Sequence, residues 1–187
     1  MPGPSKGDIR RSHRHRQRGA SIVEMALVLP VLMLTLIGIM ETGIAFQDYL
    51  TVSYVAREGA RIGAFLGDDI GADCAVVQSV ALGLTGRQLS RLNRLEVFRA
   101  DASGNQVTGD TNTYTYNTGD PQDCDNWTSV VTWPETDRQV VVGTDPLDIL
   151  GVRVVLRHDW VTGFPPFSGS FTINEETITR MEPEAYE

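Results

Sequence analysis

Histidine and cysteine, the side chains most often used to bind metals or attack substrates, are scarce in this 187-residue chain, which has three and two of them. His13 and His15 lie in a basic amino-terminal segment, so a three-histidine zinc site would have to combine them with the distant His158. The sequence contains neither a phosphate-binding Gly-Lys-Ser/Thr loop nor a dinucleotide-binding glycine fingerprint. We therefore expect no enzyme, no metal or other cofactor, and no small-molecule substrate.

Acidic side chains gather in two places, but neither group has the spacing of a known calcium loop. The groups are Asp68, Asp69 and Asp73, and Asp120, Asp123 and Asp125. A calcium-binding loop also needs a glycine and a terminal glutamate at fixed positions. We interpret both groups as solvated turns.

Positive charge is concentrated at the amino terminus. Residues 1–18 hold six basic side chains against Asp8, a net charge of +5, so the rest of the chain carries −13 to give the total of −8. A basic arm can bind nucleic acid, but one placed directly before an apolar run fits the positive-inside rule of membrane topology better. We expect a cytoplasmic amino terminus and no nucleic-acid partner.

The apolar run that follows is long enough to cross a membrane. Met25 to Met40 contains 16 uncharged residues, fewer than the ~20 that a spanning helix normally needs. Counted from Ala20, the helix covers about 30 Å, the thickness of a hydrocarbon core, and Glu24 then lies near the cytoplasmic interface. Pro30 removes one backbone donor, which membrane helices tolerate.

A cleaved secretory signal is the alternative interpretation of the same segment. Gly43-Ile44-Ala45 has the small-x-small pattern of a cleavage site, and cutting there would release a secreted binding domain that begins at Phe46. Glu24 inside the apolar region argues against it, and so does a core slightly longer than signal peptides use.

The helical pattern continues past Glu41 to about Leu66, where Gly67-Asp68-Asp69 ends it. Small side chains repeat every four residues on this part, and the candidates for close helix packing are Ala56, Gly59, Ala60 and Gly63. They would let another backbone approach closely. A plain amphipathic helix resting on its own domain explains them equally well.

A second helix and a hairpin are predicted next. Apolar residues between Asp69 and Arg94 indicate a helix that breaks near residues 84–86. The turn-forming residues 101–105 separate two short strand patterns and predict a hairpin. Residues 111–116 alternate polar and aromatic side chains, which is typical of an edge strand or an extended loop.

The carboxyl-terminal part predicts an antiparallel strand pair from residues 151–160 and 170–181. The apolar residues of the second strand do not alternate cleanly, which indicates a bulge near residues 174–177. We predict an α+β fold in which the long amino-terminal helix continues into a domain with a second helix and a small antiparallel sheet, the helices covering one sheet face.

Cys74 and Cys124 are the two cysteines, and in an exported domain an even pair favours a disulfide over isolated buried thiols. Closing a loop of about 50 residues stabilises a fold by roughly 4 kcal/mol on the chain-entropy model. The bridge would connect the second helix to the turn-rich middle of the chain.

The first third of the chain resembles the TadE-like minor pilins of tight-adherence (Tad/Flp) type IV pili. The residues that carry the resemblance are Arg18-Gly19-Ala20-Ser21-Ile22-Val23-Glu24-Met25-Ala26-Leu27-Val28-Leu29-Pro30, Ala56-Arg57-Glu58-Gly59-Ala60-Arg61 and the closing Thr179-Arg180-Met181-Glu182-Pro183. The resemblance implies that a prepilin peptidase removes the leader after Gly19. It also implies that the new ammonium of Ala20 pairs with Glu24, on the same or a neighbouring subunit, during pilus assembly.

The resemblance further implies an organisation and a set of partners. Residues 1–19 would be the basic leader, residues 20–66 the long helix, transmembrane to about residue 41, and residues 67–187 an extracytoplasmic domain. The partners would be the membrane, the prepilin peptidase, other pilin subunits and the Tad assembly machinery. We expect a single-pass structural subunit or assembly factor of a surface pilus used in cell adhesion, with a signal-anchored or secreted binding domain as the alternative.

Overall fold

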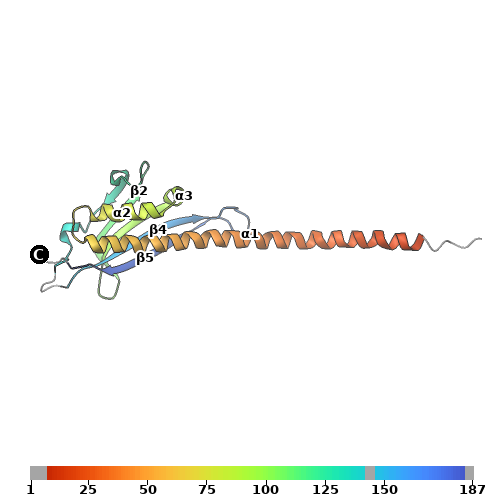
Figure 1. Ribbon diagram of the computed structural model, residues 1–187, viewed down its shortest axis with the longest axis horizontal. Coiled ribbons are helices and arrows are strands. Elements are labelled where there is room, and N and C mark those ends of the chain that lie inside the picture. The colour runs from red at the N-terminus through yellow and green to blue at the C-terminus, as the bar shows by residue number, and fades with distance from the viewer. Residues whose placement is uncertain (1–7, 142–145, 184–187) are drawn as a thin grey trace, which may run out of the picture. The chain divides into compact units, whose positions relative to one another are not determined.

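The computed structural model describes residues 8–141 and 146–183 (Figure 1). Residues 1–7 of the predicted leader lie outside the described residues, as do the side chains of residues 8–19. The chain divides into two compact units, Met1–Gly43 and Ile44–Glu187. We treat each unit by itself.

The first helix, α1, runs from Asp8 to Leu66 and contains Pro30. It ends because Gly67 adopts a left-handed backbone with φ of 58°, a conformation that glycine adopts without steric cost. The amide of Gly67 still donates to the carbonyl of Gly63 at 3.0 Å, which satisfies one of the last helical acceptors. The predicted end of the long helix at Leu66 is confirmed.

Two shorter helices follow, α2 at Ala72–Gly83 and α3 at Gly86–Leu89. Leu84 between them is extended, and Thr85 caps α3 because its hydroxyl accepts from the backbone amide of Gln88 while the Gln88 side chain accepts from that of Thr85. The predicted break in the second helical segment is therefore confirmed, and a capping box starts the new helix.

Five antiparallel strands form one sheet in the order β3-β2-β1-β4-β5. Their bounds are Leu92–Ala100 for β1, Gln106–Tyr116 for β2, Trp127–Val130 for β3, Ile149–Asp159 for β4 and Ser170–Arg180 for β5. Short 3-10 helices, η1 at Cys124–Asn126 and η2 at Glu135–Asp137, flank β3. The β1–β2 hairpin is the predicted one, and the Asp101 carboxylate accepts from the amides of Ser103 and Asn105 in its turn.

The prediction that residues 111–116 form an edge strand or a loop is wrong. They belong to β2, which lies inside the sheet because the short β3 pairs with it from Thr113↔Val130 to Tyr116↔Trp127. Asn112 explains how a polar strand can lie there. Its side chain is buried and bonds the backbone of Trp133 on both sides, accepting at 2.9 Å and donating at 2.7 Å.

The bulge predicted near residues 174–177 is also absent, since β5 pairs with β4 in unbroken register from Ser170 to Arg180. The irregular apolar pattern has another cause. Ile173 is buried on the inner face, whereas Ile178, five residues later, must point to the opposite face of a regular strand. There the Ile178 side chain lies over Gly104 in the β1–β2 turn.

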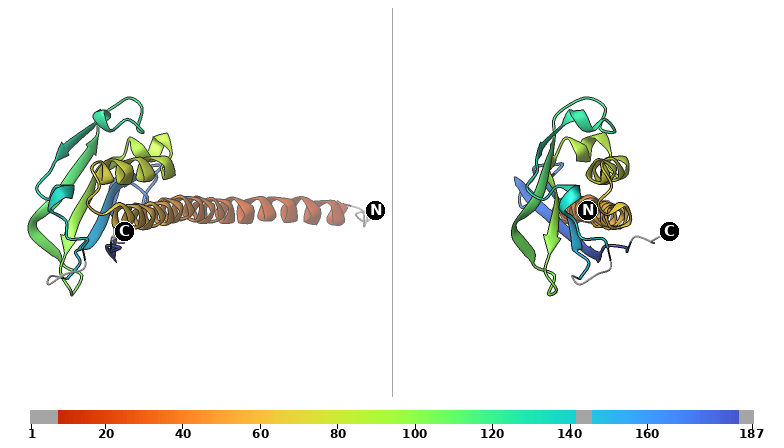
Figure 2. Two further views of the ribbon diagram at one scale, coloured as in Figure 1. Left: turned by 60° about the vertical axis from the view of Figure 1, so that its left-hand side comes forward. Right: turned by 90° about the vertical axis from the view of Figure 1, so that its left-hand side faces the viewer.

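The core of the second unit lies between one face of the sheet and the two longer helices. Figure 2 shows α2 and the later part of α1 on the same side of the sheet, as the predicted α+β layout requires. Valine and leucine dominate where the elements meet, and the buried set includes Val52, Val55, Val76, Val80, Leu95, Val97, Leu150, Val152, Val154 and Leu156. The elements of the second unit therefore cover this sheet face by themselves.

Candidate functional site

The predicted processing segment lies within α1. Gly19 and Ala20 are both helical, and Ala20 and Glu24 are exposed. Because they are four residues apart, they share one face of the helix, one turn from each other. An amino terminus created at Ala20 would therefore lie next to the Glu24 carboxylate of the same chain.

The helix after Glu24 leaves its apolar side chains uncovered. Within the helix from Ala20 to Leu66, an 18-residue segment has a mean hydropathy of 2.5, and none of that segment is buried. The exposed large side chains are Ile22, Val23, Met25, Leu27, Val28, Leu29, Val31, Leu32, Met33, Leu34, Leu36, Ile39 and Met40. Soluble monomers rarely expose more than a few hundred Å² of contiguous apolar surface. A helix of this length and composition can anchor the chain in a membrane.

The four packing candidates contact their own unit. Ala56 and Ala60 are buried within the core. A Cβ at Gly59 would lie 3.1 Å from Val80 of α2, and one at Gly63 would lie 3.0 Å from Val76. These small residues let α1 approach α2 and β4 closely, so in this structure they serve packing inside the second unit.

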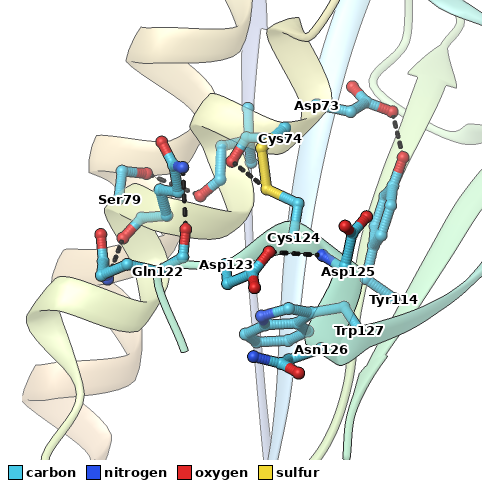
Figure 3. The surroundings of a disulfide bond; sticks show 12 residues. Asp73, Cys74, Ser79, Tyr114, Gln122, Asp123, Cys124, Asp125, Asn126 and Trp127 are labelled. Carbon is cyan, nitrogen blue, oxygen red and sulfur yellow. Dashed lines mark hydrogen bonds between the residues drawn. A yellow bond between two sulfur atoms is a disulfide. The ribbon is translucent and has the colours of Figure 1, made fainter. Parts of the chain in front are cut away.

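Cys74 of α2 and Cys124 of η1 form a disulfide with a Cα–Cα distance of 5.9 Å (Figure 3). The predicted bridge is confirmed. A reciprocal pair of hydrogen bonds lies beside it. The side-chain amide of Gln78 donates to the backbone carbonyl of Gln122 at 2.9 Å, and the side-chain amide of Gln122 donates to the backbone carbonyl of Gln78 at 3.3 Å. Together these contacts fix the segment before β3 to α2.

Asp73 is not part of a solvated turn, as we had interpreted it, but is 2% exposed. Its carboxylate pairs with the buried guanidinium of Arg138 at 2.5 Å and accepts from Asn112 and Tyr114, each at 2.7 Å. Arg138 also lies over the Trp133 ring, 4.7 Å from its centroid. No local sequence pattern indicates this pair, because 65 residues separate its members.

Burial and then the Asp73 carboxylate raise the pKa of Tyr114 well above its usual range. The phenol therefore stays protonated and donates to Asp73 (Figure 3). Both carboxylate oxygens of Asp73 already bind protein groups, so this carboxylate is unsuited to bind a cation. In the part of the chain that the structure describes, no group of three His, Cys, Asp or Glu side chains is placed to hold a metal.

His158 is fully buried, so its role is structural. Its Nδ1 lies 2.7 Å from the Asp48 carboxylate of α1, which also accepts from Gln88 at 2.8 Å. The sequence pattern could have predicted that both side chains face the core. His158 continues the alternation of Val154 and Leu156 on the inner face, and Asp48 precedes the buried Val52 by one helical turn.

Comparison with known proteins gives one match. The family model described as TadE-like protein matches residues 19–61, which confirms the resemblance over the first helix. No curated protein and no solved structure matches the chain. The matched segment contains the processing segment, the exposed apolar stretch and three of the four packing candidates.

Proposed function

We propose that the chain is a pilin-like structural subunit or assembly factor of a tight-adherence pilus, processed after Gly19 and anchored in the membrane by α1. The observation that carries the proposal is the match of residues 19–61 to the TadE-like family over a helix whose apolar face is uncovered. The second unit would then lie outside the cytoplasm, where its disulfide can persist.

Glu24 supports this proposal because a lone carboxylate in an apolar helix needs a partner. A charge at the bilayer centre costs about 2.5–3.5 kcal/mol by insertion scales, and less near the interface. Cleavage after Gly19 supplies an ammonium one turn away, and charge pairing is stronger in a low-dielectric bundle than in water. We therefore assign Glu24 to assembly rather than to insertion or folding.

The test compares the natural chain with Glu24→Gln, which keeps the shape of the side chain and deletes its charge. We expect an Ala20 amino terminus in both, detected by mass spectrometry of membrane fractions and lost without the prepilin peptidase, but few pili in the variant. Asp69→Asn, which removes an exposed carboxylate just after α1, is the matched control and should leave pili unchanged.

Each other outcome contradicts a defined part of the proposal. A Phe46 terminus would establish the secreted binding domain instead, and an intact leader would establish a simple signal anchor. Normal processing with normal pilus numbers in Glu24→Gln would refute the charge-pairing role and leave the processing role standing.

A further inference from the structure

One end of the second unit carries aromatic side chains in a segment without charge. Residues 160–174, which include the β4–β5 loop, contain no charged residue in a chain where 21% of the residues are charged. Phe164 and Phe171 are 51% and 39% exposed. Immersing such a segment in an apolar medium requires no charge to be desolvated.

The loop is held in place by ring packing. Trp160 lies 5.2 Å from Phe167 and 5.3 Å from Phe171, measured between ring centroids, and the ring of the buried His158 lies 4.9 Å from that of Phe171. The amide of Phe167 donates to the carbonyl of Phe164 and closes a turn. The exposed Phe164 is thus presented on a supported loop.

Two further exposed aromatic residues lie at the same end. The contact between His158 and Asp48 places the end of β4 beside residues 44–49 of α1. Phe46 and Tyr49 are 61% and 43% exposed there, with ring centroids 6.4 Å apart. Tyrosine and tryptophan are enriched where membrane proteins meet the headgroup region, and phenylalanine occurs on the buried face of helices that lie in this region.

Both ends of the second unit carry charged side chains of both signs. Arg87, Arg91 and Arg157 gather near Asp48; Arg87 and Arg91 line one hollow with it, and the Arg157 amide donates to the Arg91 carbonyl at 3.0 Å. Asp159 lies there as well and pairs with Arg91 at 3.3 Å and with Arg157 at 3.1 Å, which leaves three arginines against two carboxylates. At the far end of the sheet, by the β1–β2 turn, Arg99 pairs with Asp110 and Asp148. Basic side chains attract anionic lipid headgroups.

The chain itself keeps this end close to a membrane. Phe46 lies six positions after Met40, the last residue of the uncharged run, which is about 9 Å of helix. That length is comparable with the ~5–8 Å that headgroups add on each side of the hydrocarbon core.

We propose that the aromatic end of the second unit, defined by Phe46, Tyr49, Phe164 and Phe171, inserts into the headgroup region of the extracytoplasmic leaflet. This inference rests on the proposed membrane anchoring by α1. Before assembly, the loop would then hold the domain in a fixed orientation on the bilayer. Assembly into a filament would have to withdraw the four aromatic side chains from lipid.

The test uses the full chain in nanodiscs that hold one chain each, made of phosphatidylglycerol and phosphatidylcholine brominated close to the headgroup. Bromine quenches indole emission at contact range. Phe164→Trp places an indole in the proposed contact, and Ile70→Trp is the matched control, because Ile70 is 94% exposed and lies four residues after the far end of α1. We expect brominated lipid to remove most of the emission added by Phe164→Trp and none of that added by Ile70→Trp.

Equal emission in brominated and ordinary lipid for Phe164→Trp would overturn the proposal, and so would equal quenching of both indoles. Shielding of the Phe164→Trp indole only in discs that hold two chains would show that a second copy covers the surface instead. A chain that fails to enter the discs would contradict the anchoring as well, which separates failure of the premise from failure of the inference.

Discussion

Apolar side chains are exposed in the first part of α1, before residue 44, and buried on one face of its later part. Leu32 and Ile39 are 52% and 64% exposed, whereas Val52 and Val55, farther along the same helix, are fully buried. Helix geometry is common to both parts, so the difference lies in what packs against them. Small residues such as Gly59 and Gly63 let α2 and β4 cover the later part.

The carboxylates of the first part of α1 and of the second unit differ in the same way. Glu24 is exposed among apolar neighbours, while Asp48 and Asp73 are buried against His158 and Arg138. Every charge buried in a fold needs a partner, because an unpaired one loses its hydration without compensation. The second unit thus supplies partners for these two buried carboxylates, and the first part of α1 leaves its apolar side chains exposed.

Removing a buried charge should expose this difference most strongly. Asp73→Asn leaves the Arg138 guanidinium buried without a counter-charge, and breaking such a pair typically costs about 3–5 kcal/mol. Glu24→Gln, the matched change in the exposed part, should leave the unfolding free energy of the second unit unchanged. Urea unfolding of the full chain in detergent, followed by tryptophan fluorescence, measures both.

A double variant sharpens this prediction. Asp73→Leu combined with Arg138→Met removes both charges, so it should lose less stability than Asp73→Asn alone. Equal loss in the two variants would mean that hydrogen bonds from Asn112 and Tyr114 dominate, and that the ion pair contributes little.

Opening the disulfide should have the next largest effect. Replacing Cys74 and Cys124 together by serine frees a loop whose ends are 50 residues apart, and a bridge of that span contributes typically about 2–4 kcal/mol. We expect a lower urea midpoint for the second unit, with the helix content of α1 before residue 44 retained in circular dichroism. An unchanged midpoint would show that the Gln78–Gln122 hydrogen bonds already fix this segment.

The sequence predicted the elements better than their long-range partners. Hydrophobic periodicity found the long helix and its end at Gly67, and turn residues found the β1–β2 hairpin, because these signals are local. The place of residues 111–116 inside the sheet was missed, since it depends on a four-residue strand that starts at Trp127. Such a short strand carries almost no pattern of its own.

The site was predictable in a similarly uneven way. The cysteine pair was predicted from its count and is confirmed as a disulfide, whereas the roles of Gly19 and Glu24, which come from spacing and resemblance, stay predictions. Asp73 and Asp48 were missed because a carboxylate on a helix is normally solvated, and only the fold brings Arg138 and His158 within reach. Position on the buried stripe of α1 is the one signal that could have identified Asp48.

The smallest effect is expected from enlarging a glycine in each part of α1. At Gly63 a Cβ would already lie 3.0 Å from Val76 and 3.2 Å from Leu150, so the rest of a leucine side chain has no space, and Gly63→Leu should destabilise the second unit by about 1–3 kcal/mol. Gly43→Leu is the matched control, because nothing lies within 4 Å of its Cβ position. Leucine favours a helix over glycine by up to ~1 kcal/mol, yet Gly43 lies outside the second unit, so its urea midpoint should not change. Equal midpoints for both variants would mean that α2 can move away from α1 without loss, and that close approach of the helices does not hold the unit together.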